Sequence, residues 1–169
     1  MGMREPVPTE HERSAADLYR EAVLVQHEAA KSAHQGLFCF DDSRYVMSSG
    51  NIIQSILALA GEGIDKVHIA VDWEHLLMVA LWTSARPPVF DVISLLKKAG
   101  VGEAELLPFK TADINDLFPW LYYGRKFDVL RKVCSVAKAK TEAKITGKYV
   151  PVICHLLSDD TERIVASSL

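Results

Sequence analysis

The stretch FKTADINDLFPWLYYGRKFDV, residues 109–129, constrains the fold more than any other part of the sequence. Its apolar frame consists of Phe109, Leu117, Phe118, Phe127 and Val129. The pattern predicts helices over residues 114–123 and 127–144, with Gly124 between them. The stretch contains no nucleophile–base pair, no metal-ligand set and no cofactor loop. We therefore expect a surface that binds other proteins, and no enzyme activity.

Composition limits the remaining possibilities. The chain has 169 residues, of which 49% are hydrophobic, and this is enough for one compact domain with a real core. Its net charge of -3 gives no basic signature, so we expect no nucleic-acid partner. No apolar run reaches the roughly 18 residues of a membrane span, so we expect no membrane association. The three widely spaced cysteines fit a reducing compartment, the cytoplasm and/or the nucleus.

Hydrophobic periodicity outside the opening stretch predicts a β-β-α-β-α order, an insert, and then helices. Residues 1–20 have the composition of a flexible leader. The predicted strands are residues 22–25, 36–40, 67–71 and 106–107, with a long turn over residues 29–35. A further helix is predicted to follow a starting turn at residues 48–51 and to end at residues 61–63, and others are predicted over residues 73–83, 89–99 and 150–157, with Asp72 as a possible helix cap.

Two segments resemble a known family of adaptors. RYVMSSGNIIQSIL, residues 44–57, resembles the first-helix segment of elongin C. Phe109, Asp113, Leu117-Phe118 and the triplet 127–129 fall where the Skp family of F-box adaptors has F…D…LF…LDI. The resemblance implies an α+β fold with a BTB/POZ-like β-β-α-β-α core in residues 21–128. It also implies a C-terminal helical extension of the Skp type in residues 129–169.

The same resemblance implies a non-catalytic adaptor that links an F-box-type protein to a cullin-like scaffold in a ubiquitin ligase-like complex. The residues expected to bind the F-box-type partner are Phe127, Val129, Val133, Val136, Ile145, Tyr149, Ile153, Leu156 and Leu157. Arg125 and Lys126 are expected at the scaffold contact. The alternatives are a structural subunit of a non-ligase assembly, such as a kinetochore-type F-box complex, and a BTB domain that associates weakly with itself. No cofactor and no metal are expected.

Several residues have side chains suited to metal or acid–base chemistry. Cys154 and His155 precede Asp159-Asp160, but adjacent side chains on a predicted helix diverge, so we interpret the pair as a buried cysteine beside an exposed histidine. The histidines at positions 27, 34, 68 and 75 are scattered. His68 is either a pH-sensitive group or, as we favour, a histidine on the surface of a strand.

Overall fold

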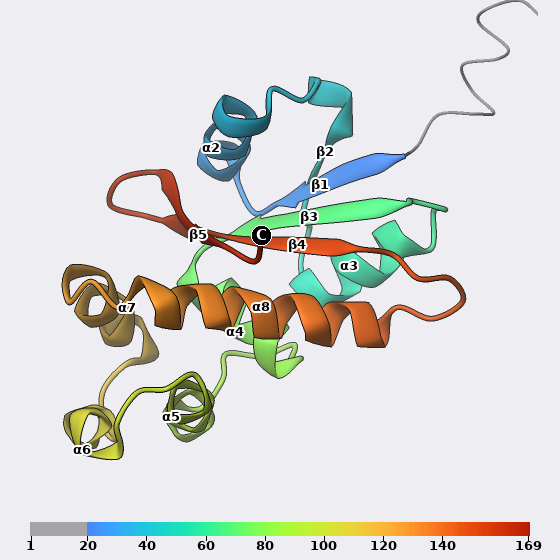
Figure 1. Ribbon diagram of the computed structural model, residues 1–169. Coiled ribbons are helices and arrows are strands. Elements are labelled where there is room, and N and C mark those ends of the chain that lie inside the picture. Colours follow the sequence, from blue (N-terminus) through green and yellow to red (C-terminus); the bar gives the residue numbers. More distant parts are fainter. Residues whose placement is uncertain (1–19) are drawn as a thin grey trace, which may run out of the picture.

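The computed structural model describes residues 20–169, which form one five-stranded sheet with helices on both faces (Figure 1). The strands are β1 (Glu21–Val25), β2 (Tyr45–Met47), β3 (Lys66–Val71), β4 (Val152–Ser158) and β5 (Arg163–Ser167). The α-helices are α2 (Glu28–Phe38), α3 (Ile52–Ala60), α4 (Trp73–Leu81), α5 (Val89–Lys98), α6 (Glu103–Leu106), α7 (Ile114–Tyr123) and α8 (Phe127–Lys144). Two 3-10 helices, η1 (Asp42–Arg44) and η2 (Leu107–Phe109), complete the described part. The expected α+β class is confirmed at this level, and the predicted leader lies outside the described residues apart from Arg20.

The sheet is mostly parallel. Its strand order is β2-β1-β3-β4-β5, in which only β5 is antiparallel to its neighbour. The central strands β1, β3 and β4 are almost entirely buried, and their sequences are nearly continuous apolar runs. Such runs are typical of parallel strands that are covered on both faces. The register places His68 of β3 between Val23 of β1 and Ile153 of β4.

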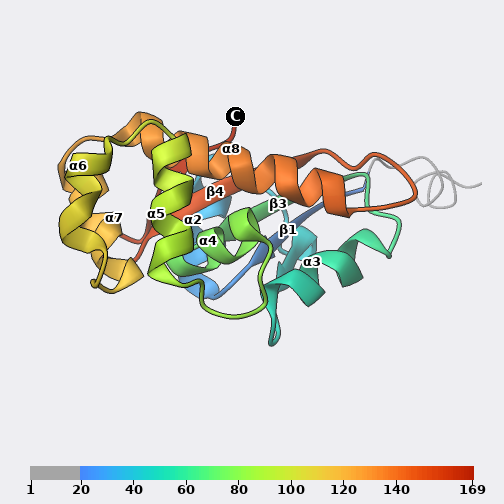
Figure 2. The ribbon, with the colours of Figure 1, turned by 90° about the horizontal axis from the view of Figure 1, so that it is seen from below.

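Helices cover the two faces of the sheet unequally. The larger core lies between the sheet and α3, α4 and α8, and α5, α6 and α7 gather at one end beyond them (Figures 1 and 2). The other face carries α2, which lies over a smaller core. That smaller core consists of Val23, Val25, Ala30, Ala70 and Leu157. Within residues 20–169, none of the helices combines the length and hydropathy that crossing a membrane requires.

Side-chain caps fix where α3 and α4 begin. The carboxamide oxygen of Asn51 accepts a hydrogen bond from the N–H of Ile53 at 2.8 Å at the start of α3. Asp72 accepts one from the N–H of His75 at 2.9 Å at the start of α4. Such caps satisfy backbone donors that have no partner within the helix. The predicted cap at Asp72 is therefore confirmed, and Asn51, the last residue of the predicted starting turn, is the cap of α3.

The predicted second strand, residues 36–40, is wrong. Residues 28–38 form α2, and Phe40 lies in the loop that follows it. Ala30 and His34 lie four residues apart and are both buried, which is the spacing of one helix face. The small polar residues between them concealed this period. The described chain therefore begins β-α-β, and the predicted β-β-α-β-α order is corrected at its second element.

The predicted helix over residues 150–157 is also wrong, because this segment forms β4 and is followed by β5. Short apolar runs fit a buried strand and a buried helix equally well, and Val152 and Ile153 are β-branched residues that favour a strand. The predicted short strand at residues 106–107 is instead the junction of α6 and η2. The expected helical extension is therefore reduced to α8, and β4 joins the sheet beside β3.

Candidate metal centre

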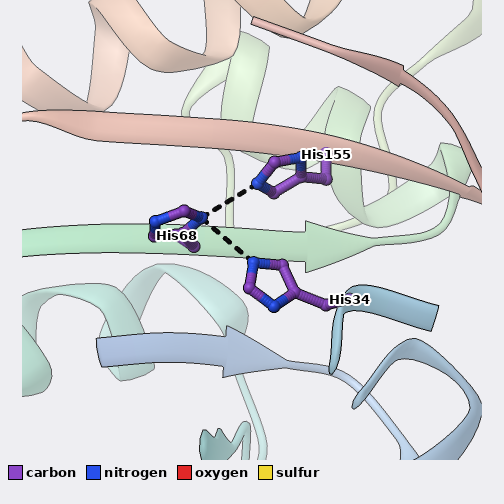
Figure 3. Close-up of side chains that lie close together, drawn as sticks. All are labelled: His34, His68 and His155. Atoms are coloured by element: carbon purple, nitrogen blue, oxygen red, sulfur yellow. Dashed lines mark hydrogen bonds between the residues drawn. The ribbon is translucent and has the colours of Figure 1, made fainter. Parts of the chain in front are cut away.

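Three histidines from distant parts of the chain meet on the face of the sheet that α2 covers. His68 on β3 and His155 on β4 lie two register positions apart, because His155 is opposite Ala70, and their side chains share one face. His34 lies in α2, above that face. Figure 3 shows the three rings pointing toward one another. We call His34, His68 and His155 the histidine cluster.

The inward ring nitrogens of the cluster are close enough to share an ion. His68 Nδ1 lies 3.0 Å from His34 Nε2 and 3.0 Å from His155 Nε2. All three nitrogens lie within 4.8 Å of one another. A tetrahedral ion with metal–nitrogen bonds of about 2.05 Å holds its ligand nitrogens about 3.4 Å apart. To reach this spacing, the two pairs at 3.0 Å need to separate by a few tenths of an ångström, and His34 Nε2 and His155 Nε2, which lie within 4.8 Å of each other, need to come to about the same distance.

The outward ring nitrogens are each held by a different polar group. The three contacts are His34 Nδ1 with the Tyr45 hydroxyl at 2.7 Å, His68 Nε2 with a Glu21 carboxylate oxygen at 2.6 Å, and His155 Nδ1 with the Ser167 hydroxyl at 2.6 Å. Such outer partners fix the tautomer and the orientation of histidines that ligate metals. Glu21 can only accept, so it fixes the proton of a neutral His68 on Nε2 and leaves Nδ1 unprotonated toward the centre. The Tyr45 and Ser167 hydroxyls can accept the outward N–H of His34 and His155, which would leave their inward nitrogens free as metal ligands.

Burial keeps the cluster uncharged. The three residues are at most 1% exposed. Loss of hydration, with a smaller contribution from neighbouring histidines, lowers the pKa of His34 to about 4 and that of His155 to about 3. Burial also lowers the pKa of His68, although the Glu21 carboxylate opposes the shift. Neutral imidazole is the form that binds metal, so the cluster is ready to bind at neutral pH.

Hydrogen bonding alone does not satisfy the centre well. Because Glu21 accepts the Nε2 proton of a neutral His68, Nδ1 of that ring has one in-plane lone pair and no proton. Both His34 Nε2 and His155 Nε2 approach this single lone pair. An ion at the centre would use one lone pair from each ring, and the outward N–H groups would keep Tyr45, Glu21 and Ser167 as partners. The three nitrogens therefore fit a bound cation better than they fit two hydrogen bonds to the single lone pair of His68 Nδ1.

Aromatic rings enclose the cluster on the side of α2. The ring centroid of Phe38 lies 4.4 Å from that of His34 and 5.2 Å from those of His68 and His155. Phe40 lies 5.5 Å from His34 and 5.4 Å from His68. Among the described residues, no fourth His, Cys, Asp or Glu joins the three inward nitrogens. The space between the inward nitrogens is thus bordered by three nitrogen donors and, on the side of α2, by the hydrocarbon of Phe38 and Phe40.

The residues expected to bind an F-box-type partner are spread over different environments. Val133, Leu156 and Leu157 are buried in the chain's own cores, so in this structure they offer no surface to a partner. Partly buried positions are Val129, Val136, Ile145 and Ile153. Phe127 and Tyr149 are exposed, at 38% and 71%. At the expected scaffold contact, Arg125 is exposed, and Lys126 is partly buried with its ammonium 5.4 Å from the Trp120 ring.

The predicted helix over residues 150–157 separates His155 from His68 and hides the histidine cluster in the sequence. Cys154 is buried as expected, but the expectation of an exposed His155 is wrong, since that side chain is 0% exposed. If residues 152–158 are taken as a strand parallel to β3, His68 and His155 fall on one sheet face. His34 has a weaker signal, its helical spacing from Ala30.

Comparison with known proteins adds no family assignment. No protein-family model, no curated protein and no solved structure matches this chain.

Proposed function

We propose that this chain binds a first-row transition-metal ion through His34, His68 and His155. One observation carries the proposal. The three inward nitrogens lie within 4.8 Å of one another, while each outward nitrogen contacts a different polar partner. Imidazole is a common protein ligand for zinc, copper, iron and nickel ions. The identity of the ion is a separate question, taken up below.

The role of the ion is structural. Structural metal sites are closed to solvent, whereas catalytic sites keep a coordination position open. The histidine cluster is at most 1% exposed, and its three residues come from α2, β3 and β4. An ion would therefore pin the single helix of this face to the two central strands, over a smaller core of only a few apolar side chains.

The test is metal content after equilibrium dialysis. The metal-free, untagged chain is dialysed separately against cobalt, nickel and zinc ions and, anaerobically with a reductant, against copper ions, then desalted and measured by inductively coupled plasma mass spectrometry. For at least one of these metals we expect about one ion per chain, and below about one tenth of that for His68→Gln and His155→Gln. His75→Gln is the matched control, because His75 contacts Asp72 at the start of α4, outside the cluster.

Two results would overturn the proposal. One is a wild-type chain that retains none of the four metals. The other is equal retention by wild type, His68→Gln and His155→Gln. Circular dichroism of each variant separates a lost site from a lost fold.

A second proposal follows from the resemblance to Skp-family adaptors. We propose a non-catalytic adaptor whose exposed residues Phe127 and Tyr149 anchor an F-box-type partner. Their exposure supports it, and the absence of a helix over residues 152–158 counts against it. The test is affinity purification from cells with wild type and Phe127→Asp. A partner that wild type recovers and the variant loses supports the adaptor, and recovery of no F-box-type protein refutes it.

A further inference from the structure

The charges around the histidine cluster bear on the charge of the metal ion that it would bind. Glu21 is the anionic side chain that hydrogen-bonds to the cluster, through His68 at 2.6 Å. The same carboxylate also lies 3.5 Å from the guanidinium of Arg44 and 3.6 Å from the ammonium of Lys66. Its charge is thus already shared between two cations. A divalent ion would add two positive charges to a buried site without a free anion, and this is costly in a low dielectric.

The number of available ligands also argues against a divalent ion such as zinc. Zinc in structural sites is almost always four-coordinate. The cluster supplies three nitrogens, and the Phe38 ring lies nearly equidistant from all three imidazoles, at 4.4, 5.2 and 5.2 Å between ring centroids. Among residues 20–169 no fourth His, Cys, Asp or Glu reaches the centre, so a water bound as the fourth ligand would lie beside the rings of Phe38 and Phe40. An ion that is stable with three ligands does not need such a water.

We infer that the ion is monovalent copper, held by the three histidine nitrogens in a three-coordinate site. This inference rests on the proposed function. Cu(I) has a filled d shell and no need for a fourth ligand, and a single positive charge reduces the unbalanced charge in the buried site. Imidazole binds copper as well as it binds zinc, and the apolar shell offers no hydrogen-bond partner to the water that a divalent ion would keep as a ligand.

The experiment compares Cu(I) and Zn(II) on the same chain under anaerobic conditions, each in competition with a chelator of known affinity. Cys39 is an exposed thiol that would bind Cu(I) itself, so the measurement uses the full chain with Cys39→Ser. Ag(I) serves as a probe without redox chemistry. We expect one Cu(I) or Ag(I) per chain, bound at least about 100-fold more tightly than Zn(II).

A variant that lacks the Phe38 ring tests why the site would prefer Cu(I) to Zn(II). Phe38→Ala opens the fourth position, and we expect it to reduce the preference for Cu(I) over Zn(II) by about 10-fold or more. Phe118→Ala is the control, because Phe118 packs against Trp73 on the other side of the sheet. X-ray absorption of the Cu(I)-loaded Cys39→Ser chain checks the geometry independently, with three nitrogen ligands expected.

The outcomes separate the inference from the proposed function. Zn(II) binding as tight as Cu(I), with Co(II) giving the visible spectrum of a four-coordinate site, overturns the inference and leaves the proposed function intact. A fourth ligand in the Cu(I) absorption data also overturns the inference. If none of these ions binds, both fail.

Discussion

Acidification should destabilise the metal-free protein through the histidine cluster. The pKa of His34 is about 4 and that of His155 about 3 in the folded chain, against an ordinary value of 6.5. Between pH 6.5 and pH 4 the unfolded chain therefore binds protons that the folded chain does not. Stability is fully present above pH 6.5 and is lost as the pH falls. One proton per histidine gives about 2 kcal/mol for each of the two residues between pH 6.5 and pH 5.

Urea denaturation of the metal-free chain at pH 7 and pH 5, with chelator present, measures this loss. Wild type should lose about 4 kcal/mol from His34 and His155 together, and His155→Gln should lose about 2 kcal/mol less. His75→Gln is an informative control, because a hydrogen bond to Asp72 raises the pKa of His75. A histidine with a raised pKa stabilises the fold more at pH 5 than at pH 7. Replacing His75 should therefore increase the drop in the free energy of unfolding between pH 7 and pH 5. If His155→Gln loses as much stability as wild type, the reasoning is wrong.

Four further predictions concern stability and metal affinity. Metal at about 100 times its dissociation constant should add about 2.7 kcal/mol to the free energy of unfolding, seen as a higher melting temperature that the His68→Gln variant lacks. Tyr45→Phe removes the hydroxyl that holds His34 Nδ1 at 2.7 Å, and should weaken metal affinity about 10- to 100-fold in chelator competition without unfolding the chain. Gly36→Ala should stabilise the fold by about 0.5–1 kcal/mol in urea, because Gly36 lies inside α2 and an added Cβ meets nothing within 4 Å. Leu157→Asp should abolish folding by circular dichroism, because it buries a carboxylate at a position that is 1% exposed.

Periodicity and capping residues are sufficient to predict much of the secondary structure around the larger core. Alternating apolar residues identified β3, and Asn51 and Asp72 marked the starts of α3 and α4, because caps and strand alternation are local properties of a sequence. The long amphipathic α8 was also predicted with its observed bounds. These elements need no knowledge of their tertiary partners.

The wrong assignments in the segments that form α2 and β4 have a common physical cause. Most residues of α2 are either small or polar, and the helix buries only Ala30 and His34. Its apolar stripe is therefore too narrow to recognise in the sequence. The run that became β4 is apolar on both faces, which removes the alternation that distinguishes a strand from a helix. In both segments tertiary contacts decide the structure.

The histidine cluster depended on both of those segments. His34 belongs to α2 and His155 to β4, so the two assignment errors hid two of its three members. The spacing of the three histidines also follows no short metal-binding motif, because a parallel sheet and its covering helix bring together residues that are far apart in the chain. Only the register of β3 and β4 places His68 and His155 side by side.

The most direct test of the metal centre is a crystal of the metal-loaded chain, with anomalous diffraction recorded at the absorption edge of the metal. A single peak is expected about 2 Å from His34 Nε2, His68 Nδ1 and His155 Nε2. A loaded crystal with no peak among these three nitrogens, or with its peak elsewhere on the chain, would contradict the proposed metal centre.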